Sequence, residues 1–306
     1  MHHNHLYLIT GATSGIGLEV ATNLARSDES NLIIVGARNP ARTEALRQAV
    51  PHQQLLVLDL DTSSLTSVRS FATKVQAAIG PNKLSGMALN AGVQIVSGDQ
   101  YSVDGFELTF ATNVLGHIVL FQLLKQNLAS SSVIVSTASG THDKDHKLAK
   151  PYKFYGGYFP SAEDVAAGQV SDNNAKAQLG RDRYATSKLC NVLFTYAMAA
   201  KFGANGPRFM AFDPGLMPGT ELARDQPAAL RFAWKNILPT AAKMIDGAST
   251  AQRSGAMLAQ LLTREIYQTG TGLHIEFTGK QIPSSGMSYD HVLQDALMAF
   301  ALKAAG

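Results

Sequence analysis

Tyr184 and Lys188 lie four positions apart in a segment whose pattern predicts a helix. This spacing places both side chains on one helical face, one turn apart. A nearby ammonium favours the phenolate, so we expect Lys188 to lower the pKa of Tyr184 from its usual value of about 10 towards neutrality. Such a phenol can donate or accept a proton under ordinary conditions. The pair is common by chance, so its weight depends on the residues around it.

A glycine-rich turn near the N-terminus supplies such a context. Residues 10–17 read TGATSGIG; they follow the apolar run 5–9 and precede a helical pattern. Glycines here allow a tight turn, close approach of the backbone to a pyrophosphate, and close packing of helix on strand. The helix N-terminus then offers free N–H groups to phosphate, which favours a dinucleotide site over an ordinary turn. The residues expected to contact the cofactor there are Gly11, Thr13, Ser14, Gly15, Ile16 and Gly17.

Composition is that of an ordinary globular protein. The 306 residues are 45% hydrophobic and 16% charged, with a net charge of +3 and no Lys/Arg-dense segment, which argues against a nucleic-acid partner. The single cysteine, Cys190, excludes an intrachain disulfide and suits a reducing compartment. A strand beginning near residue 5 leaves no room for a signal peptide, and no apolar stretch approaches about 20 residues. We therefore expect a cytoplasmic protein without a transmembrane segment.

Apolar runs alternate with amphipathic helical stretches, and this pattern predicts the elements that position these residues. The expected fold is α/β: one Rossmann-type, doubly wound parallel sheet of about seven strands with helices on both faces. The expected strands are 6–10, 31–36, 54–59, 86–90, 132–137, 207–213 and 271–276. The expected helices lie around 16–27, 40–49, 64–79, 104–127, 184–203, 248–263 and 290–304.

Two long connections interrupt a chain, 1–306, that otherwise reads as a single domain. They are residues 140–183 and 216–247, and at the carboxyl edge of the sheet they predict a lid or substrate pocket. The first is rich in aromatic residues, which indicates either a bulky, apolar substrate or simple loop packing. These residues are Tyr152, Phe154, Tyr155, Tyr158 and Phe159. Within the second, the amphipathic stretch 230–238 suggests a lid or, with less support, a peripheral membrane contact.

Together these motifs resemble the classical short-chain dehydrogenase/reductase family. The resembling motifs in chain order are TGxxxGxG at 10–17, Asp59-Leu60, Asn90-Ala91-Gly92, Asn113, Ser139, Tyr184-x-x-x-Lys188 and Pro214-Gly215. The first glycine spacing favours the classical over the extended members. The stretches around Asn113 and after Lys188 are most similar to the retinol dehydrogenase and protochlorophyllide reductase branch. The resemblance spans residues 5–290, approximately.

The resemblance implies roles for the catalytic residues. Tyr184 would be the general acid or base and Lys188 its partner at the nicotinamide ribose, while Ser139 would hold the substrate carbonyl. Thr137 shares a strand face with Ser139 and is the alternative. Asn113 would open its helix locally and hold a water in a proton relay. The family also implies a homodimer or homotetramer through the helices of Asn113 and Tyr184, an assembly that the insertions here could block.

Cofactor choice depends on the end of the second strand. An acid there would grip the ribose of NAD, whereas residues 35–38 read VGAR. Arg38 can stack on adenine and pair with an extra phosphate, so we expect NADP(H). The resemblance adds further cofactor contacts. These are Asp59 and Leu60 at the adenine, Asn90, Ala91 and Gly92 after the fourth strand, and Pro214, Gly215 and Thr220 beside the carboxamide.

Other residues with reactive side chains do not indicate a site. His142 to His146 are consecutive in a predicted loop and include a lysine, which disfavours a metal site. Cys190 and His117 are interpreted as core residues. Leu89 occupies the position where protochlorophyllide reductases carry a cysteine.

The prediction is therefore an NADP(H)-dependent oxidoreductase that interconverts a carbonyl and an alcohol on a small-molecule substrate. The alternatives are reduction of a conjugated C=C bond and a non-catalytic NADP(H)-binding regulator.

Overall fold

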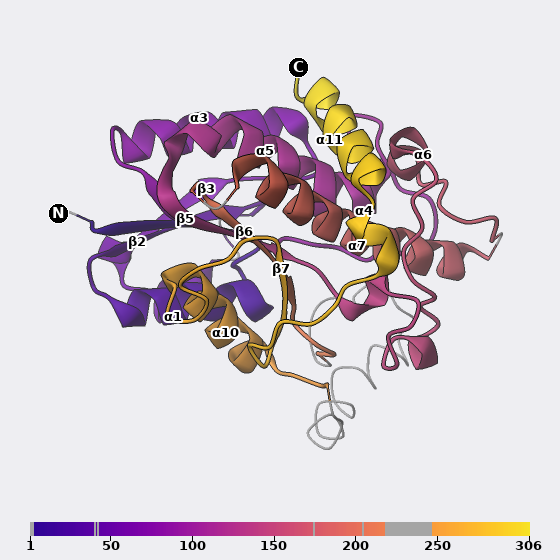
Figure 1. Ribbon diagram of the computed structural model, residues 1–306. Helices are drawn as coiled ribbons and strands as arrows, with labels where there is room; N and C mark the ends of the chain where they lie inside the picture. The colour runs from indigo at the N-terminus through magenta and orange to yellow at the C-terminus, as the bar shows by residue number, and fades with distance from the viewer. Residues whose placement is uncertain (1–2, 40, 42, 174, 204, 218–246) are drawn as a thin grey trace.

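A single parallel sheet of seven strands forms the centre of the computed structural model, which describes residues 3–306 except 40, 42, 174, 204 and 218–246. Its strand order is β3-β2-β1-β4-β5-β6-β7, and the chain can be followed from N to C in Figure 1. The strands are β1 (His5–Thr10), β2 (Asn31–Ala37), β3 (Leu55–Asp59), β4 (Leu84–Leu89), β5 (Leu128–Thr137), β6 (Arg208–Asp213) and β7 (Leu273–Glu276). The predicted doubly wound α/β fold is confirmed.

The strand order reverses between β1 and β4. Ile9 of β1 pairs with Val35 of β2 on one side and with Ala88 of β4 on the other. The chain therefore winds outwards in both directions from the sheet centre, and a crevice opens at the carboxyl ends of β1 and β4. The predicted glycine loop and residues 90–92 leave the sheet at that point.

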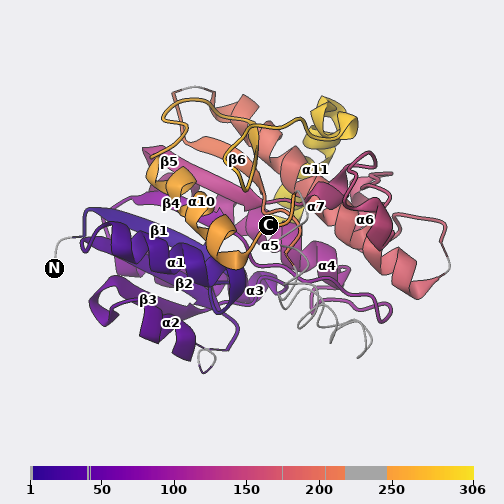
Figure 2. The ribbon, with the colours of Figure 1, turned by 90° about the horizontal axis from the view of Figure 1, so that it is seen from below.

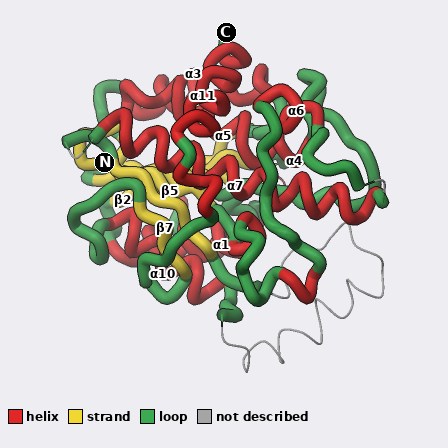
Figure 3. The backbone as a smooth tube through the Cα atoms, turned by 45° about the vertical axis from the view of Figure 1, so that its right-hand side comes forward, coloured by secondary structure: helices red, strands yellow, loops and turns green. Residues whose placement is uncertain are grey.

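Helices cover both faces of the sheet, as Figures 2 and 3 show. Helices α1 and α10 lie together on one face, while α3, α5, α7 and α11 lie on the other. The principal helices are α1 (Gly15–Ser27), α2 (Glu44–Ala49), α3 (Leu65–Ile79), α4 (Leu108–Phe110), α5 (Gly116–Leu124), α6 (Ala162–Ala167), α7 (Lys176–Phe202), α10 (Ala251–Thr263) and α11 (His291–Ala305).

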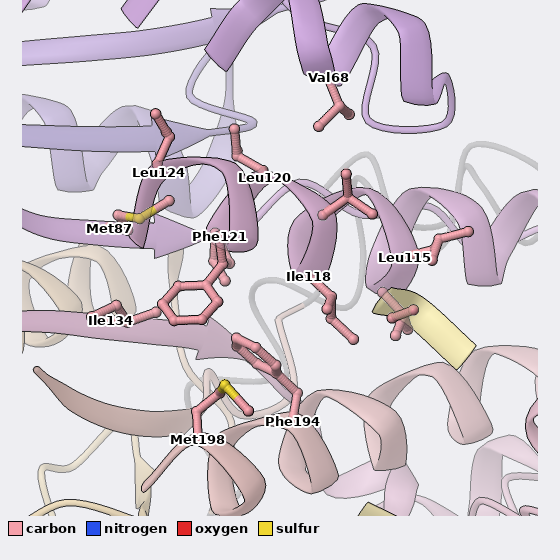
Figure 4. Packing of buried hydrophobic residues seen from close by; sticks show 14 of the residues in the cluster. Val68, Met87, Leu115, Ile118, Leu120, Phe121, Leu124, Ile134, Phe194 and Met198 are labelled. Carbon is pink, nitrogen blue, oxygen red and sulfur yellow. The ribbon is translucent and has the colours of Figure 1, made fainter. Parts of the chain in front are cut away.

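The larger hydrophobic core lies between the sheet and α3, α5 and α7. Figure 4 shows Phe121 of α5 beside Phe194 of α7, with ring centroids 5.5 Å apart and an edge-to-face orientation. Both rings are almost completely removed from water, and burial of a phenylalanine contributes about 1.5–3 kcal/mol. This packing fixes α7, which carries Tyr184, and α5, which continues the helical run that carries Asn113.

The helical run Leu108–Asn127 is long and apolar enough to cross a membrane by length and composition alone. Sequence analysis did not recognise a helix of this length and hydropathy, because polar residues interrupt the apolar stretch within it. Of its most apolar window, 78% is buried inside the protein, between the sheet and neighbouring helices. The run is therefore the central core helix of this layer.

Helix α7 begins at Lys176, two turns before the predicted start at residue 184. Gly180 lowers the helix propensity of this stretch and hid those turns from sequence reasoning. A Cβ at Gly180 would lie 2.2 Å from the carbonyl oxygen of Ile95, so close packing requires the glycine. The connection 140–183 also contains helix α6 and is therefore not a simple loop. Most of the second connection, including the stretch 230–238, lies outside the described residues.

Candidate active site

A cavity of about 960 Å³ opens at the carboxyl ends of the central strands. The volume is near the upper end of the range for ligand pockets, roughly 300–1,000 Å³, and leaves room for a large ligand. The walls come from five places: the glycine loop, the end of β2, the segment after β4, the end of β5 and helix α7. The connection 140–183 adds a further wall through residues 140–141, 146, 148–149 and 151–154.

The glycine loop has the geometry that a pyrophosphate requires. Gly11 has φ +70°, and a Cβ there would lie 2.8 Å from the Cα of Ala91. Gly15 also has a positive φ, of 59°, but a Cβ there would meet nothing within 4 Å, because this residue faces the cavity. A Cβ at Gly17 would lie 2.3 Å from the carbonyl oxygen of Gly11. Gly17 therefore allows helix α1 to pack closely against the loop, and it does not line the cavity.

Helix α1 begins at this loop with Gly15 and Ile16, both of which line the cavity, so the unpaired N–H groups of its first turn belong to the cavity wall. The N-cap residue, Ser14, makes no side-chain capping bond. Thr13, Ser14, Gly15 and Ile16 all line the cavity. Helix terminus, open glycine and cavity together fit the phosphate-binding part of a dinucleotide site.

The end of β2 forms a second wall. Arg38 is exposed, lines the cavity, and makes no ion pair with another described residue. Leu60 lies opposite: a Cβ at Gly36 would come within 2.4 Å of its side chain. Asp59 is exposed and does not line the cavity, so the structure does not bring it to the adenine wall as predicted. The reason is strand alternation, because Asp59 and Leu60 point to opposite sides.

The segment after β4 is held against β1 by Thr10. The backbone N–H groups of Asn90 and Ala91 donate to the Thr10 hydroxyl oxygen at 2.9 and 3.0 Å. The same hydroxyl lies 2.9 Å from Nε2 of His117, which is buried as predicted. Asn90, Ala91 and Gly92 all line the cavity. Sequence reasoning did not connect Thr10 or His117 with this wall.

Asn113 lies in a single turn of π-helix, Ala111–Leu115, inserted between α4 and α5. This local opening of the helix is the geometry that the family resemblance implied. Oδ1 of Asn113 accepts a hydrogen bond from the Val93 N–H at 2.8 Å. Nδ2 donates to the Val93 carbonyl and to the Ser187 hydroxyl, both at 3.0 Å. The side chain thus fastens the segment after β4 to helix α7.

Tyr184, Lys188 and Ser139 meet at the inner end of the cavity. Both α7 residues are buried, and Nζ of Lys188 lies 5.5 Å from the ring centroid of Tyr184. Nζ also donates to the carbonyl oxygen of Thr137 at 2.8 Å, and Nδ2 of Asn191 donates to the same oxygen at 3.0 Å. Two side chains of α7 therefore fix the end of β5, directly before Ser139.

The pKa of Tyr184 contradicts the sequence prediction. Burial raises this pKa above its ordinary value of 10, although the hydrogen bond with the Ser139 side chain opposes the rise. Burial also lowers the pKa of Lys188 to about 8. Spacing along a helix places the two groups together but does not reveal that both are desolvated, and desolvation disfavours both charged forms.

Ser139, not Thr137, interacts with Tyr184. The Ser139 side chain hydrogen-bonds Tyr184 and affects its pKa, whereas the Thr137 hydroxyl donates to Oδ1 of Asn90 at 3.3 Å. Both residues line the cavity, as the shared strand face predicted. Thr137 instead links the ends of β4 and β5.

The end of β6 completes the cavity. Pro214 and Gly215 line it, and Gly215 has φ +75° with its Cα against Phe277. The buried Asp213 accepts a hydrogen bond from the Gly215 N–H at 3.0 Å and lines the same wall. Sequence reasoning missed Asp213, whose position before the Pro-Gly pair was its only signal. Thr220 lies outside the described residues.

The structure also places the cysteine and the aromatic residues that the sequence analysis singled out. Cys190 is buried and burial raises its pKa, consistent with a packing role. Among the described residues no group of potential ligands could hold a metal ion. Of the five aromatic residues in the insertion, Tyr152 and Phe154 line the cavity, while Phe159 packs into the core. Tyr155 and Tyr158 are exposed.

Comparison with known proteins identifies the family. Residues 5–153 match the family model described as short chain dehydrogenase. The chain is 31% identical to retinol dehydrogenase 12 of Mus musculus, over 80% of this chain and 71% of that protein. It belongs to the short-chain dehydrogenase family. It is also 32% identical to the short-chain dehydrogenase TIC 32 B, chloroplastic, of Brassica napus, over 75% and 71% of the two chains.

Two further similarities bear on branch and fold. The chain is 29% identical to the protochlorophyllide reductase of Chlamydomonas reinhardtii, over 84% of this chain and 66% of that protein. The predicted retinol dehydrogenase and protochlorophyllide reductase branch is thus supported. The crystal structure of NADPH-bound carbonyl reductase from chicken fatty liver has the same fold, with a TM-score of 0.61, 18% identity and coverage of 93% and 100%. The chain is therefore a short-chain dehydrogenase/reductase, an oxidoreductase family that binds a nicotinamide cofactor.

Proposed function

We propose that this protein is an NADP(H)-dependent oxidoreductase that reduces a carbonyl to an alcohol, with Tyr184 as the general acid. The observation that carries the proposal is the meeting of Tyr184, Ser139 and Lys188 in the same cavity as the glycine loop. A bound nicotinamide would supply or accept the hydride, so the protein has to supply position and a proton. In this proposal Ser139 holds the carbonyl oxygen and Tyr184 donates the proton to it.

The protonation state of the phenol is compatible with the reductive direction. Because burial raises the pKa of Tyr184, the phenol carries its proton at neutral pH. A protonated phenol can act as an acid at once, which suits carbonyl reduction. Alcohol oxidation is the reverse of the same proton transfer and would use the same residue as the base. Lys188 contributes by fixing the end of β5 through Thr137 and by presenting an ammonium next to the phenol.

The preference for NADP(H) rests on Arg38. Arg38 lines the cavity at the end of β2 and forms no ion pair with a described residue. A guanidinium matches the geometry of a phosphate and can also stack on adenine. The glycine loop binds the pyrophosphate, with Leu60 at the adenine and Asn90, Ala91 and Gly92 along the ribose side. The carbonyl reductase from chicken fatty liver, which shares the fold, is described as NADPH-bound.

The insertion 140–183 forms the substrate side of the pocket in this proposal. Its residues Leu148, Ala149, Pro151, Tyr152 and Phe154 line the cavity and supply apolar surface. The rings of Phe154 and Tyr184 lie 6.0 Å apart, so an apolar wall reaches the proposed acid. A bulky substrate with an apolar body fits such a wall.

Reduction of a conjugated C=C bond is the second candidate, favoured by the similarity to protochlorophyllide reductase. The same acid could then protonate a carbon atom instead of a carbonyl oxygen. A non-catalytic regulator would have no need of Tyr184 inside the cavity.

The test is NADPH oxidation with a panel containing aldehydes, ketones and enones, analysed by product identity. We expect alcohols as the products. Saturated ketones from the enones would favour the second candidate, and absence of turnover across a broad panel would favour the regulator.

A further inference from the structure

Two cations of the cavity wall are not explained by the cofactor. Arg38 and Lys188 have cofactor-facing positions in the proposed function, but Lys153 and Arg181 line the substrate side. We infer that the carbonyl substrate carries an anionic group, a carboxylate or a phosphate, held by Lys153 and Arg181. This inference rests on the proposed function and extends it to the class of substrate.

Arg181 is placed by the helix that carries the proposed acid. It precedes Tyr184 by three residues on α7, so both side chains occupy the same helical face. Their Cα atoms are separated along the helix axis by about 4.5 Å, three times the rise per residue. One guanidinium nitrogen of Arg181 donates to the Ala177 carbonyl at 3.2 Å. The remaining N–H groups make no hydrogen bond with a described residue and can reach a ligand.

Lys153 is placed by an unusual backbone conformation. It ends a short helical turn, residues 150–152, with φ +63°, a left-handed conformation that is uncommon for a residue with a Cβ. Its carbonyl oxygen accepts a hydrogen bond from Nε2 of Gln178 at 2.9 Å. Gln178 lies on α7, three residues before Arg181, so this bond fastens the backbone of Lys153 to α7 about one turn from the arginine. The insertion thus brings a second cation to the same side of the cavity.

No described acid forms an ion pair with Lys153 or Arg181. Asp182, next to Arg181, accepts a hydrogen bond from Gln178 at 2.8 Å. Asp145 pairs with Lys150 at 3.9 Å, and Asp99 with Arg183 at 2.7 Å. Among the described residues that line the cavity, Asp213 alone is acidic, and it lies buried at the end of β6. The substrate side is therefore lined by two cations and by no described acid other than Asp213, which would attract an anion.

The apolar wall adjoins both the proposed acid and Lys153. Phe154 follows Lys153 directly and packs near Tyr184. A substrate that satisfies all three features has a carbonyl at Tyr184, an apolar body along the insertion and an anionic group at Lys153 and Arg181. Lys153 is exposed and Arg181 is half-buried, so both can reach an anionic group, whereas a neutral apolar substrate offers neither of them a partner.

The test compares three benzaldehydes of similar size: 4-carboxybenzaldehyde, its methyl ester and 4-formylphenyl phosphate. We expect the kcat/KM of at least one anionic aldehyde to exceed that of the ester by about tenfold, the effect of one charge-assisted hydrogen bond. Comparison of the two anionic aldehydes shows whether the site prefers a carboxylate or a phosphate. In Arg181→Gln and Lys153→Gln the ratio of anionic to ester kcat/KM should fall towards one. Lys201→Gln, at the exposed end of α7, is the matched control and should keep the wild-type ratio.

A binding measurement separates this inference from the proposed function. Calorimetric titration of the NADP-loaded protein with 4-(hydroxymethyl)benzoate and its methyl ester requires no turnover, and we expect the acid to bind about tenfold more tightly. Equal binding of acid and ester would overturn the inference. The same would follow if Lys201→Gln lowered the anionic-to-ester ratio of kcat/KM as much as Arg181→Gln and Lys153→Gln do. Turnover of the ester alone would do the same and leave the carbonyl reductase standing. Failure of every aldehyde, with the acid still bound preferentially, would instead overturn the proposed function.

Discussion

At the scale of single residues, His117 connects the two sides of the cofactor crevice through a neutral imidazole. Nδ1 donates to the Asn113 carbonyl at 3.1 Å, since a carbonyl can only accept. Nε2 must then accept from the Thr10 hydroxyl, whose oxygen receives the N–H groups of Asn90 and Ala91. Burial lowers the pKa of His117 to about 4, so this tautomer persists at neutral pH.

This burial predicts a loss of stability in mild acid. The unfolded chain protonates His117 near its ordinary pKa of 6.5, whereas the folded protein does so only near 4. Between these values the unfolded state binds more protons, so stability falls as the pH is lowered. From pH 7 to pH 5 we expect His117 to account for a loss of about 2 kcal/mol.

Urea unfolding at the two pH values measures this loss. His117→Gln should reduce the difference by about 2 kcal/mol, while His52→Gln, at an exposed position, should leave it unchanged. An unchanged difference in His117→Gln would show that the imidazole is not held neutral.

Arg38 should set the choice of cofactor. Removing its guanidinium in Arg38→Ala should weaken NADPH binding at least tenfold, because a charge-assisted phosphate contact is lost. NADH binding should change less than about twofold. Fluorescence titration with both cofactors is the measurement, with the exposed Arg26→Ala on α1 as control. An equal loss for the two cofactors would place Arg38 away from the extra phosphate.

The site residues were predictable to different degrees. Spacing alone placed Tyr184 and Lys188 on one helical face, and strand alternation placed Thr137 with Ser139. The pKa of Tyr184 was not predictable, because it depends on how completely the fold removes both groups from water. Lys153 and Arg181 gave no signal, because their position depends on the path of the insertion and on two turns of helix that Gly180 concealed.

At the scale of elements, the π-helical turn matters because it sets the start of α5. Gly116 follows it directly and packs against the segment before α3: a Cβ at Gly116 would lie 1.9 Å from the carbonyl oxygen of Thr62. The contact fixes the helix that carries Asn113. Sequence reasoning located this helix, but hydrophobic periodicity gives no information about a π turn, which arises from packing.

Gly116→Ala should therefore destabilise the protein by about 1–3 kcal/mol, the usual cost of overpacking. Gly286→Ala is the matched control, because a Cβ there meets nothing within 4 Å and its φ is not positive. Urea unfolding of the two variants is the measurement. Equal stabilities would mean that α5 can shift without penalty.

At the scale of the whole molecule, the C-terminal helix covers the layer that contains the site. Helix α11 packs on both α5 and α7, and Figure 1 shows it lying across them. Leu297, Met298 and Ala301 of α11 belong to the main hydrophobic core. The family resemblance implied assembly through α5 and α7, but α11 occupies part of that face.

We therefore expect the mass of one chain, not of two or four, in light scattering coupled to size-exclusion chromatography at micromolar concentration. A dimer with α5 and α7 protected from hydrogen exchange at its interface would contradict this expectation.

The sheet was the most predictable level. Each expected strand is present, with bounds that differ by at most four residues, because alternating apolar runs and short connections leave few topologies for a parallel sheet. The insertion 140–183 was the least predictable, since its path depends on contacts with α7 that no local pattern encodes.

Replacement of the proposed acid is the most direct test of the account. In Tyr184→Phe the ring remains but the proton donor is lost, so single-turnover NADPH oxidation with a reactive aldehyde should slow by about 10²–10⁴-fold. NADPH affinity, measured by fluorescence titration, should stay within about threefold of wild type, because the phenol is assigned to proton transfer more than to cofactor binding. A variant that turns over at the wild-type rate would contradict the assignment of Tyr184 as the acid.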